Sequence, residues 1–307
     1  MRIQPWDDTE NELKLVLPKE FNFQENINYL SRSNNECLFH IADNRIYKAI
    51  PIGEETPIIE VNSEDANHLI VRFLGESVPT SKNLRTDVTQ YVREWFDLDR
   101  DLRPFYDMAK KDLLLGQAVE SFYGLRIIGI PDLFEALCWG ILGQQINLSF
   151  AYTLKRRLVE KFGRSVMHNG VTYWVFPSPQ DIAELPVEEL ESLRMTKKKS
   201  EYLLGAAKLM ADGKLSKEML LEIGDYKSAE KMLVKIRGIG PWTANYVLMR
   251  CLRYPSAFPI DDVGLQNAIK HRLGREKKPA NDEILKLAVN WTNWESYATF
   301  YLWRFLY

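Results

Sequence analysis

The stretch Lys235-Ile-Arg-Gly-Ile-Gly-Pro-Trp-Thr-Ala244 decides the fold of its part of the chain. A helical pattern stops at Gly238-Ile239-Gly240 and resumes with Pro241, a residue that favours the first position of a helix. The two glycines permit a very tight turn, because no Cβ obstructs the backbone. The sequence therefore predicts two helices joined by a hairpin, with the unpaired amides of the second helix facing outward.

Charge is distributed unevenly around this hairpin. Residues 231–260 include five basic side chains and no acidic one. The five are Lys231, Lys235, Arg237, Arg250 and Arg253. Outward amides at a helix start suit a phosphate group, and nearby cations strengthen that interpretation. A Gly-x-Gly turn also joins helices in proteins that bind no nucleic acid, so a purely structural turn is the alternative.

Two carboxylates follow the hairpin, about twenty residues after Trp242, in Phe258-Pro-Ile-Asp-Asp-Val263. Asp261 and Asp262 stand at the start of a predicted helix, where an aspartate often serves only as the N-cap. The amides of a helix start also stabilise an ionised carboxylate. Such an aspartate would be a poor general acid and a good base or electrostatic stabiliser.

The composition is that of a globular protein: 307 residues, 46% hydrophobic and 27% charged, which excludes disordered and fibrous classes. The formal net charge is -2, but residues 1–100 carry 11 basic and 18 acidic side chains, and residues 101–307 carry 29 and 24. An acidic first third thus precedes a basic remainder. We expect a polyanionic partner to bind the second part.

Cysteine spacing and hydropathy indicate the compartment. Cys37, Cys138 and Cys251 lie about a hundred residues apart without a CxxC motif, so neither a disulfide framework nor a metal cluster is indicated. No run approaches the roughly 18 apolar residues of a membrane span, and the N-terminus lacks a signal-peptide core. We expect a cytoplasmic protein that makes no membrane contact and has no cofactor of its own.

The predicted fold class is α+β, with an antiparallel sheet domain at 1–100 followed by an all-α region at 101–307. About five strands are expected, and Asp43-Asn44 suits a tight hairpin. They are 12–17, 36–42, 45–52, 57–61 and 68–74. From about Thr86 the apolar period indicates helices. They are 87–96, 104–122, 131–146, 149–162, 186–194, 197–211, 226–236, 241–253, 262–273, 281–291 and 293–305.

Several motifs together resemble the helix-hairpin-helix (HhH-GPD) DNA glycosylases. The hairpin at about 235–246, followed by Pro259-Ile-Asp-Asp262, matches their hairpin and downstream aspartate. Ile141-Leu-Gly-Gln-Gln145, Phe176-Pro-Ser-Pro-Gln180 and Trp294-Glu-Ser-Tyr-Ala298 are similar to the DNA-3-methyladenine glycosylase II family. The likeness covers residues 100–307 in motif order and implies an N-terminal sheet domain ahead of them.

The resemblance implies a role for each matching residue. Asp262 matches the catalytic aspartate, and Leu142 matches the residue that wedges into the duplex where the base leaves. Leu142 ends an apolar helical stripe, so its tip could project, although core packing is the commoner fate of such a leucine. The base pocket would use Trp242, Tyr246 and Trp303. The DNA backbone would meet Lys235, Arg237, Gly238, Ile239, Gly240 and Thr243, and the carbonyls of Val234, Ile236 and Ile239 would hold a monovalent cation.

The implied activity is base excision repair of double-stranded DNA by a monomer that extrudes the damaged base. An alkylated purine is cationic, so aromatic walls attract it and it leaves without an acid catalyst. Bifunctional relatives carry a lysine just after the hairpin glycines, where this chain has Pro241-Trp242, so we expect a monofunctional hydrolase. A same-fold glycosylase for oxidised or deaminated bases and a noncatalytic DNA-binding module are the alternatives.

Overall fold

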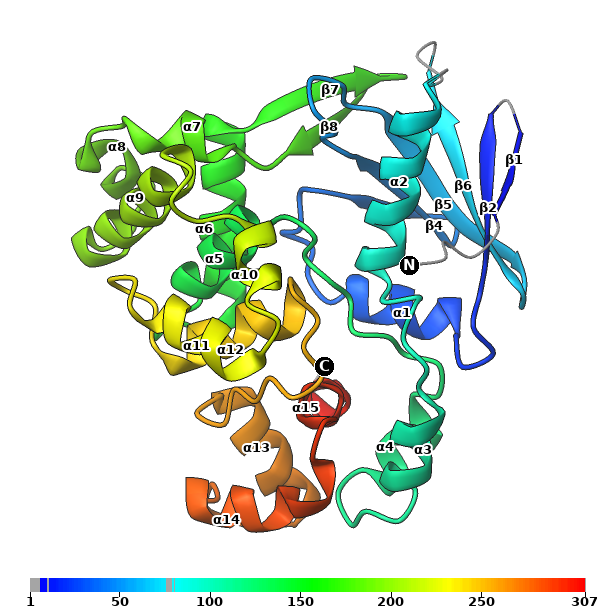
Figure 1. Cartoon of the computed structure of the whole chain (residues 1–307), viewed down its shortest axis with the longest axis vertical. Helices are drawn as coiled ribbons and strands as arrows, with labels where there is room; N and C mark the ends of the chain where they lie inside the picture. The colour runs from blue at the N-terminus through cyan, green and yellow to red at the C-terminus, as the bar shows by residue number, and fades with distance from the viewer. Residues whose placement is uncertain (1–5, 10, 76–78, 80, 307) are drawn as a thin grey trace.

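The computed structural model describes residues 6–9, 11–75, 79 and 81–306 (Figure 1). Its main sheet is antiparallel, in the order β1-β2-β6-β5-β4-β3. The strands are β1 Trp6–Asp8, β2 Glu12–Val16, β3 His40–Ala42, β4 Arg45–Ala49, β5 Ile58–Asp65 and β6 His68–Leu74. The predicted sheet is confirmed, with β1 as a sixth strand. Asp43 and Asn44 have φ angles of 50° and 58°, as the tight β3–β4 hairpin requires.

Two helices belong to the sheet domain, α1 Phe23–Leu30 and α2 Lys82–Trp95. Ile27 of α1 and Val88 of α2 share one hydrophobic core with Leu13 and Val71 of the sheet. The sequence analysis missed α1, although its N-cap gives a local signal. The side chain of Asn22 accepts hydrogen bonds from the amides of Gln24 and Glu25.

The remainder of the chain is largely helical, and its helices share the same core as the sheet domain. The predicted helix 104–122 is two helices, because the Asp112 side chain accepts hydrogen bonds from the amides of Leu114 and Leu115 and stabilises a turn between them. The helices are α3 Arg103–Ala109, α4 Gly116–Ser121, α5 Leu133–Leu142, α6 Leu148–Phe162, α7 Pro179–Ala183, α8 Val187–Glu191, α9 Lys197–Ala211, α10 Lys217–Glu222, α11 Tyr226–Val234, α12 Pro241–Arg250, α13 Val263–Arg272, α14 Asn281–Leu287 and α15 Glu295–Trp303, with 3-10 turns at Ala288–Trp291 and Arg304–Leu306.

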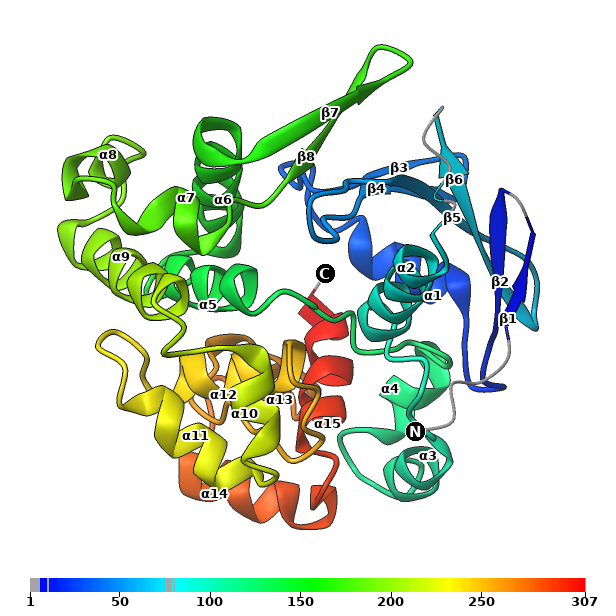
Figure 2. The same cartoon turned by 45° about the horizontal axis from the view of Figure 1, so that its top comes forward.

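The expectation that this region is all-α is wrong at one place. Strands β7 Arg164–His168 and β8 Val171–Val175 form a hairpin that extends from the helices toward the sheet domain (Figure 2). Its Tyr173 and Val175 pack against Ala49 and Ile58 of the main sheet. The dipeptide Asn169-Gly170, flanked by alternating residues, is a strong hairpin signal, but the sequence analysis assigned no strand to residues 163–185.

No helix in the described part of the chain is long and apolar enough to cross a membrane. Helices α11 and α12 flank the predicted glycine hairpin, and α5 packs against α12. Helix α15 packs against α13, which brings the C-terminal residues beside the start of α13 (Figure 2). The fold therefore gathers segments that are more than 150 residues apart, from Leu142 to Trp303, around the hairpin.

Candidate active site

Asp262 is the N-cap of α13, and three donors hold its carboxylate. Its Oδ1 accepts hydrogen bonds from the amide of Leu265 (2.7 Å) and from Nε1 of Trp303 (2.8 Å). Its Oδ2 accepts one from Nε1 of Trp242 (2.8 Å). Capping and chemistry are therefore compatible, because a carboxylate oxygen accepts more than one hydrogen bond and Oδ2 retains a free lone pair for water.

The three predicted pocket aromatics form one continuous stack. The ring centroids of Trp242 and Tyr246 are 5.8 Å apart, and those of Tyr246 and Trp303 are 6.3 Å apart, with interplanar angles of 32° and 31°. Tyr246 and Trp303 are each 5% exposed, whereas Trp242 is half-buried. Trp242 therefore presents the accessible edge of an aromatic wall whose two end residues both bind Asp262.

Gly264 is a site residue that the sequence analysis missed. A Cβ at this position would lie 2.8 Å from Oδ1 of Asp262 and 3.1 Å from Nε1 of Trp303. Only glycine allows that hydrogen bond to form against the first turn of α13. A glycine inside a helix lowers helix stability, and that unfavourable choice is the signal by which the residue could have been found.

Arg250 holds the Tyr246 member of the aromatic stack in place through hydrogen bonds. It donates hydrogen bonds to the hydroxyl of Tyr246 (2.7 Å), to the carbonyl of Ile128 (2.6 Å) and to the hydroxyl of Tyr29 (3.2 Å). Burial raises the pKa of Tyr246, so its hydroxyl stays neutral. Arg250 is 4% exposed, so this member of the basic run does not reach the surface.

The hairpin has the tight geometry that its glycines predict. Gly238 has a φ of 93°, and a Cβ there would lie 2.1 Å from the Tyr202 ring. The first helical hydrogen bond of α12 runs from the Ala244 amide to Gly240 O (2.9 Å). The earlier amides of α12, on Trp242 and Thr243, therefore have no helical acceptor. These are unpaired amides at a helix start, and the expectation that they face a phosphate stays a prediction.

Thr243 and Arg237 differ from the expected phosphate contacts. Thr243 is 1% exposed and its hydroxyl accepts a hydrogen bond from Gln144 (3.1 Å), so its side chain is not available to a phosphate. Arg237 is exposed but donates to Glu201 (2.8 Å). Lys235 is exposed.

An open groove of about 530 Å³ runs along the hairpin. All six predicted backbone-binding residues line it, together with the residues expected to hold a cation. The lining residues are Gln144, Tyr202, Val234, Lys235, Ile236, Arg237, Gly238, Ile239, Gly240, Pro241, Trp242, Thr243 and Asp261. Asp261 accepts a hydrogen bond from Asn281 (2.6 Å) and lies apart from the Asp262 contacts.

The expectation that Leu142 projects from the end of its helix is wrong. Its side chain has no exposed surface and belongs to the main core, because α5 packs that face against neighbouring helices. Three residues later, Gln145 is exposed and has a left-handed backbone with a φ of 55°. A non-glycine residue in that conformation is uncommon, and it occurs beside the hairpin, since Gln144 donates to Gly238 O (2.9 Å).

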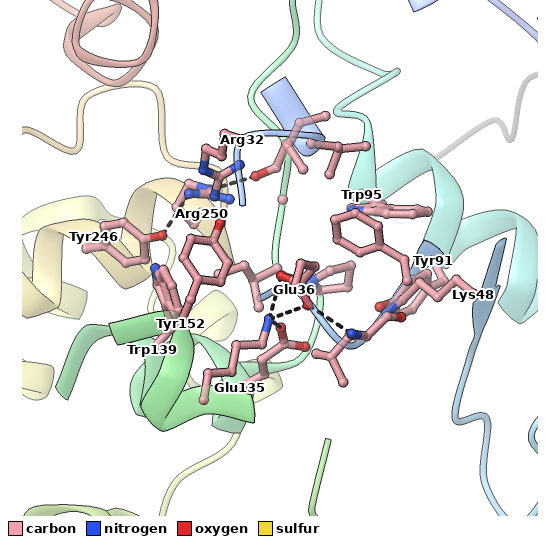
Figure 3. Close-up of a pocket in the computed structure, with 18 residues that line it drawn as sticks. Arg32, Glu36, Lys48, Tyr91, Trp95, Glu135, Trp139, Tyr152, Tyr246 and Arg250 are labelled. Carbon is pink, nitrogen blue, oxygen red and sulfur yellow. Dashed lines mark hydrogen bonds and ion pairs between the residues drawn. The ribbon is translucent and has the colours of Figure 1, made fainter. Parts of the chain in front are cut away.

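A second cavity lies between the sheet domain and the helices (Figure 3). In it, Lys155 forms ion pairs with Glu36 (3.1 Å) and Glu135 (3.2 Å), and Tyr246 closes the side toward the aromatic stack. Its volume is about 50 Å³, room for a few waters and less than the roughly 150 Å³ of an engineered cavity that binds benzene. A purine therefore does not fit it, and the accessible base surface is that of Trp242.

The described residues contain no group of three or more His, Cys, Asp or Glu side chains that could hold a metal ion. The three cysteines are buried free thiols. The site is thus a carboxylate held by two tryptophans, next to a hairpin with unpaired amides.

The chain belongs to the HhH-GPD superfamily of base excision DNA repair proteins, whose family model matches residues 138–293, and it is a DNA glycosylase. A second model, the 8-oxoguanine DNA glycosylase N-terminal domain, matches residues 13–137. The resemblance drawn from the motifs is confirmed. The predicted domain division at residue 100 stays a prediction.

This chain is similar to two curated relatives in sequence and to one solved structure in fold. A DNA-3-methyladenine glycosylase of Bacillus subtilis is 54% identical over 302 residues, which is 98% of this chain and 99% of the relative. DNA-3-methyladenine glycosylase 2 of Escherichia coli is 33% identical, over 62% of this chain and 63% of the relative. A 3-methyladenine DNA glycosylase from Archaeoglobus fulgidus superposes with a TM-score of 0.82 at 21% identity, covering 95% of this chain and 97% of that chain, and shares the fold.

Proposed function

We propose that the protein hydrolyses the N-glycosidic bond of alkylated, cationic purines such as 3-methyladenine and 7-methylguanine in duplex DNA. The observation that carries this proposal is the pair of hydrogen bonds from Trp242 and Trp303 to Asp262. They couple the aromatic wall, which attracts a cationic ring, to the carboxylate that acts on the sugar beside it. The similarity to the 3-methyladenine glycosylases named above supports the same substrate class.

The hairpin would hold the DNA backbone next to the damaged nucleotide. The free amides of Trp242 and Thr243 suit a phosphate, and exposed Lys235 adds positive charge. The carbonyls of Val234 and Ile236 lie near the end of α11, where carbonyls lack helical partners, and line the groove with Ile239. Ile236 O accepts the Ile239 amide and keeps a second lone pair, so this set fits a monovalent cation, which would neutralise part of a phosphate's charge.

Base extrusion leaves a gap in the stack that a side chain must fill. Because Leu142 is buried, we assign this role to Gln145, which is exposed three residues beyond the end of α5, beside the hairpin. A glutamine can also hydrogen-bond to the base left without a partner.

The chemistry then needs one carboxylate. A cationic purine departs as a neutral base, so no acid has to protonate the leaving group. Asp262 would stabilise the positive charge that develops on the sugar, and Oδ2, which faces the half-buried Trp242, would orient the attacking water.

Hydrolysis would be the whole reaction, without strand cleavage. The position after the hairpin glycines is Pro241-Trp242, which offers no amine nucleophile. Lys231 and Lys235 precede the hairpin and are exposed, and the amine of Lys199 is buried and donates to Leu142 O (2.7 Å).

Chromatography of bases released from methylated duplex DNA tests the substrate class. The wild type should release 3-methyladenine and leave an intact strand with an abasic site. Borohydride should trap no enzyme–DNA adduct, and a trapped adduct would contradict hydrolysis as the whole reaction. Absence of any released methylpurine would overturn the proposed substrate.

A glycosylase for oxidised bases is the second candidate, favoured by the match of residues 13–137 to the 8-oxoguanine glycosylase N-terminal domain. The same chromatography on DNA containing 8-oxoguanine or hypoxanthine decides between the two. Release of 8-oxoguanine in preference to 3-methyladenine would select the second candidate.

A further inference from the structure

The first turn of α9 carries positive charge that the fold does not use. Lys197 and Lys198 are exposed, and Arg194 is exposed just before them. Within the described residues, neither lysine has a carboxylate partner. Cations at a helix N-terminus oppose the helix dipole, and this first turn contains no acidic residue to offset them. The two lysines therefore do not stabilise α9, and another role is needed to explain them.

This turn is held firmly beside the hairpin groove by the residues that follow it. Lys199 donates to the carbonyl of Leu142 at the end of α5. Glu201 accepts the hydrogen bond from Arg237, and the Tyr202 ring fills the space that the absent side chain of Gly238 leaves. These contacts connect α9 to both sides of the groove.

Helical spacing places the lysines on the groove side. Lys197 precedes Glu201 by four residues, and Lys198 precedes Tyr202 by four, so each lies one turn before a residue that touches the hairpin. One turn is about 5.4 Å, a length over which duplex DNA presents about three phosphate charges. DNA in the groove would therefore extend over the first turn of α9.

We propose that Arg194, Lys197 and Lys198 form a second phosphate-binding edge for duplex DNA. This proposal rests on the proposed function, in which DNA occupies the hairpin groove. The edge supplies charge that the hairpin lacks, since Glu201 engages Arg237 and Arg250 is buried. Its contacts are to phosphates and carry no base specificity.

The test compares two variants that each remove two positive charges. Lys197→Ala/Lys198→Ala removes the two lysines of the edge and keeps Arg194, and Lys208→Ala/Lys214→Ala removes exposed lysines at the other end of α9 and just beyond it. Binding is measured by fluorescence anisotropy over a range of salt concentrations, with a duplex that contains a stable abasic-site analogue. Each lost phosphate contact reduces the magnitude of the negative slope of log K against log salt by about 0.9. The slope of the edge variant should therefore be about 1.8 less steep than that of the wild type, and the slope of the control should be unchanged.

The edge variant should unfold at the wild-type temperature or above, because it removes cations from a helix N-terminus. The control should release bases at the wild-type rate in single-turnover assays at saturating enzyme. An edge-variant slope equal to that of the wild type, or an equal loss in the control, would overturn the proposal. The DNA analogue is not cleaved, so this result does not depend on the substrate. A wild type that binds with the full slope but releases no methylpurine would contradict the proposed function and leave the edge intact.

Discussion

Replacing Gly264 with alanine should impair catalysis without unfolding the protein. The added Cβ would lie 2.8 Å from Oδ1 of Asp262, and ordinary contact begins near 3.4 Å, so the carboxylate must move by roughly 0.6 Å. Nε1 of Trp303, at 3.1 Å from the same Cβ, must also move, and the hydrogen bond between the two side chains weakens. Catalytic groups tolerate displacements of about 0.5 Å, and a displacement of about 1 Å costs roughly a hundredfold in rate.

We therefore expect a 10- to 100-fold slower single-turnover release of 3-methyladenine by Gly264→Ala, as an order of magnitude. Alanine is favoured over glycine in a helix by about 1 kcal/mol, and this gain offsets part of the lost hydrogen bond, so the melting temperature should change little. The matched control is Gly205→Ala in α9, where nothing lies within 4 Å of the new Cβ. The control should be at least as stable as the wild type and fully active. A Gly264→Ala rate within twofold of the wild type would refute the reasoning.

Three further predictions concern the site and the interdomain cavity. Asp262→Asn should slow base release by more than about a hundredfold and preserve binding to uncleaved DNA, because the amide keeps one acceptor and loses the charge; normal release would contradict the mechanism. Trp242→Ala should reduce release of cationic 7-methylguanine about 30-fold more than release of neutral hypoxanthine, the equivalent of a cation–π contact of about 2 kcal/mol, and equal losses would exclude this selection. Lys155→Met should destabilise the fold by about 3 to 5 kcal/mol at neutral pH, measured by urea unfolding. Burial alone would raise the pKa of Glu36, but Lys155 and the Leu38 amide hold it below its usual value, so the stability that Glu36 contributes to the wild type is lost as pH falls. In the variant, without Lys155, the pKa of Glu36 rises, and that stability is lost as pH rises instead. The difference in stability between the two proteins should therefore shrink toward about pH 5.

Local sequence patterns predicted the elements whose signals are local. The hairpin at Gly238, the cap at Asp262 and the turn at Asp43-Asn44 each depend on a few neighbouring residues, and the structure has all three. Long-range contacts were not predictable in this way. The first turn of α13 requires glycine because Trp303, about forty residues later, donates to Asp262, and no local pattern contains that constraint.

The missed elements divide into two kinds. The cap of α1 at Asn22 and the Asn169-Gly170 turn were present in the sequence, but neither stretch was assigned a helix or strand. The burial of Leu142 was not readable, because an apolar residue at a helix end is buried or exposed according to which helices pack beyond it. The position of its exposed neighbour Gln145 depends on a left-handed φ, and the sequence does not predict that conformation for a residue other than glycine.

The basic run shows why charge along the chain differs from charge in space. Of its five members, Arg250 is buried against Tyr246, Arg253 pairs with Asp97, and Arg237 pairs with Glu201. Internal partners thus take up much of the charge that the run offers to DNA. The free charge of α9 comes from a segment about forty residues earlier that packing brings to the same groove. Affinity for a polyanion follows the cations that remain unpaired at one surface, so the salt dependence of DNA binding should respond to the α9 lysines and not to removal of Arg253.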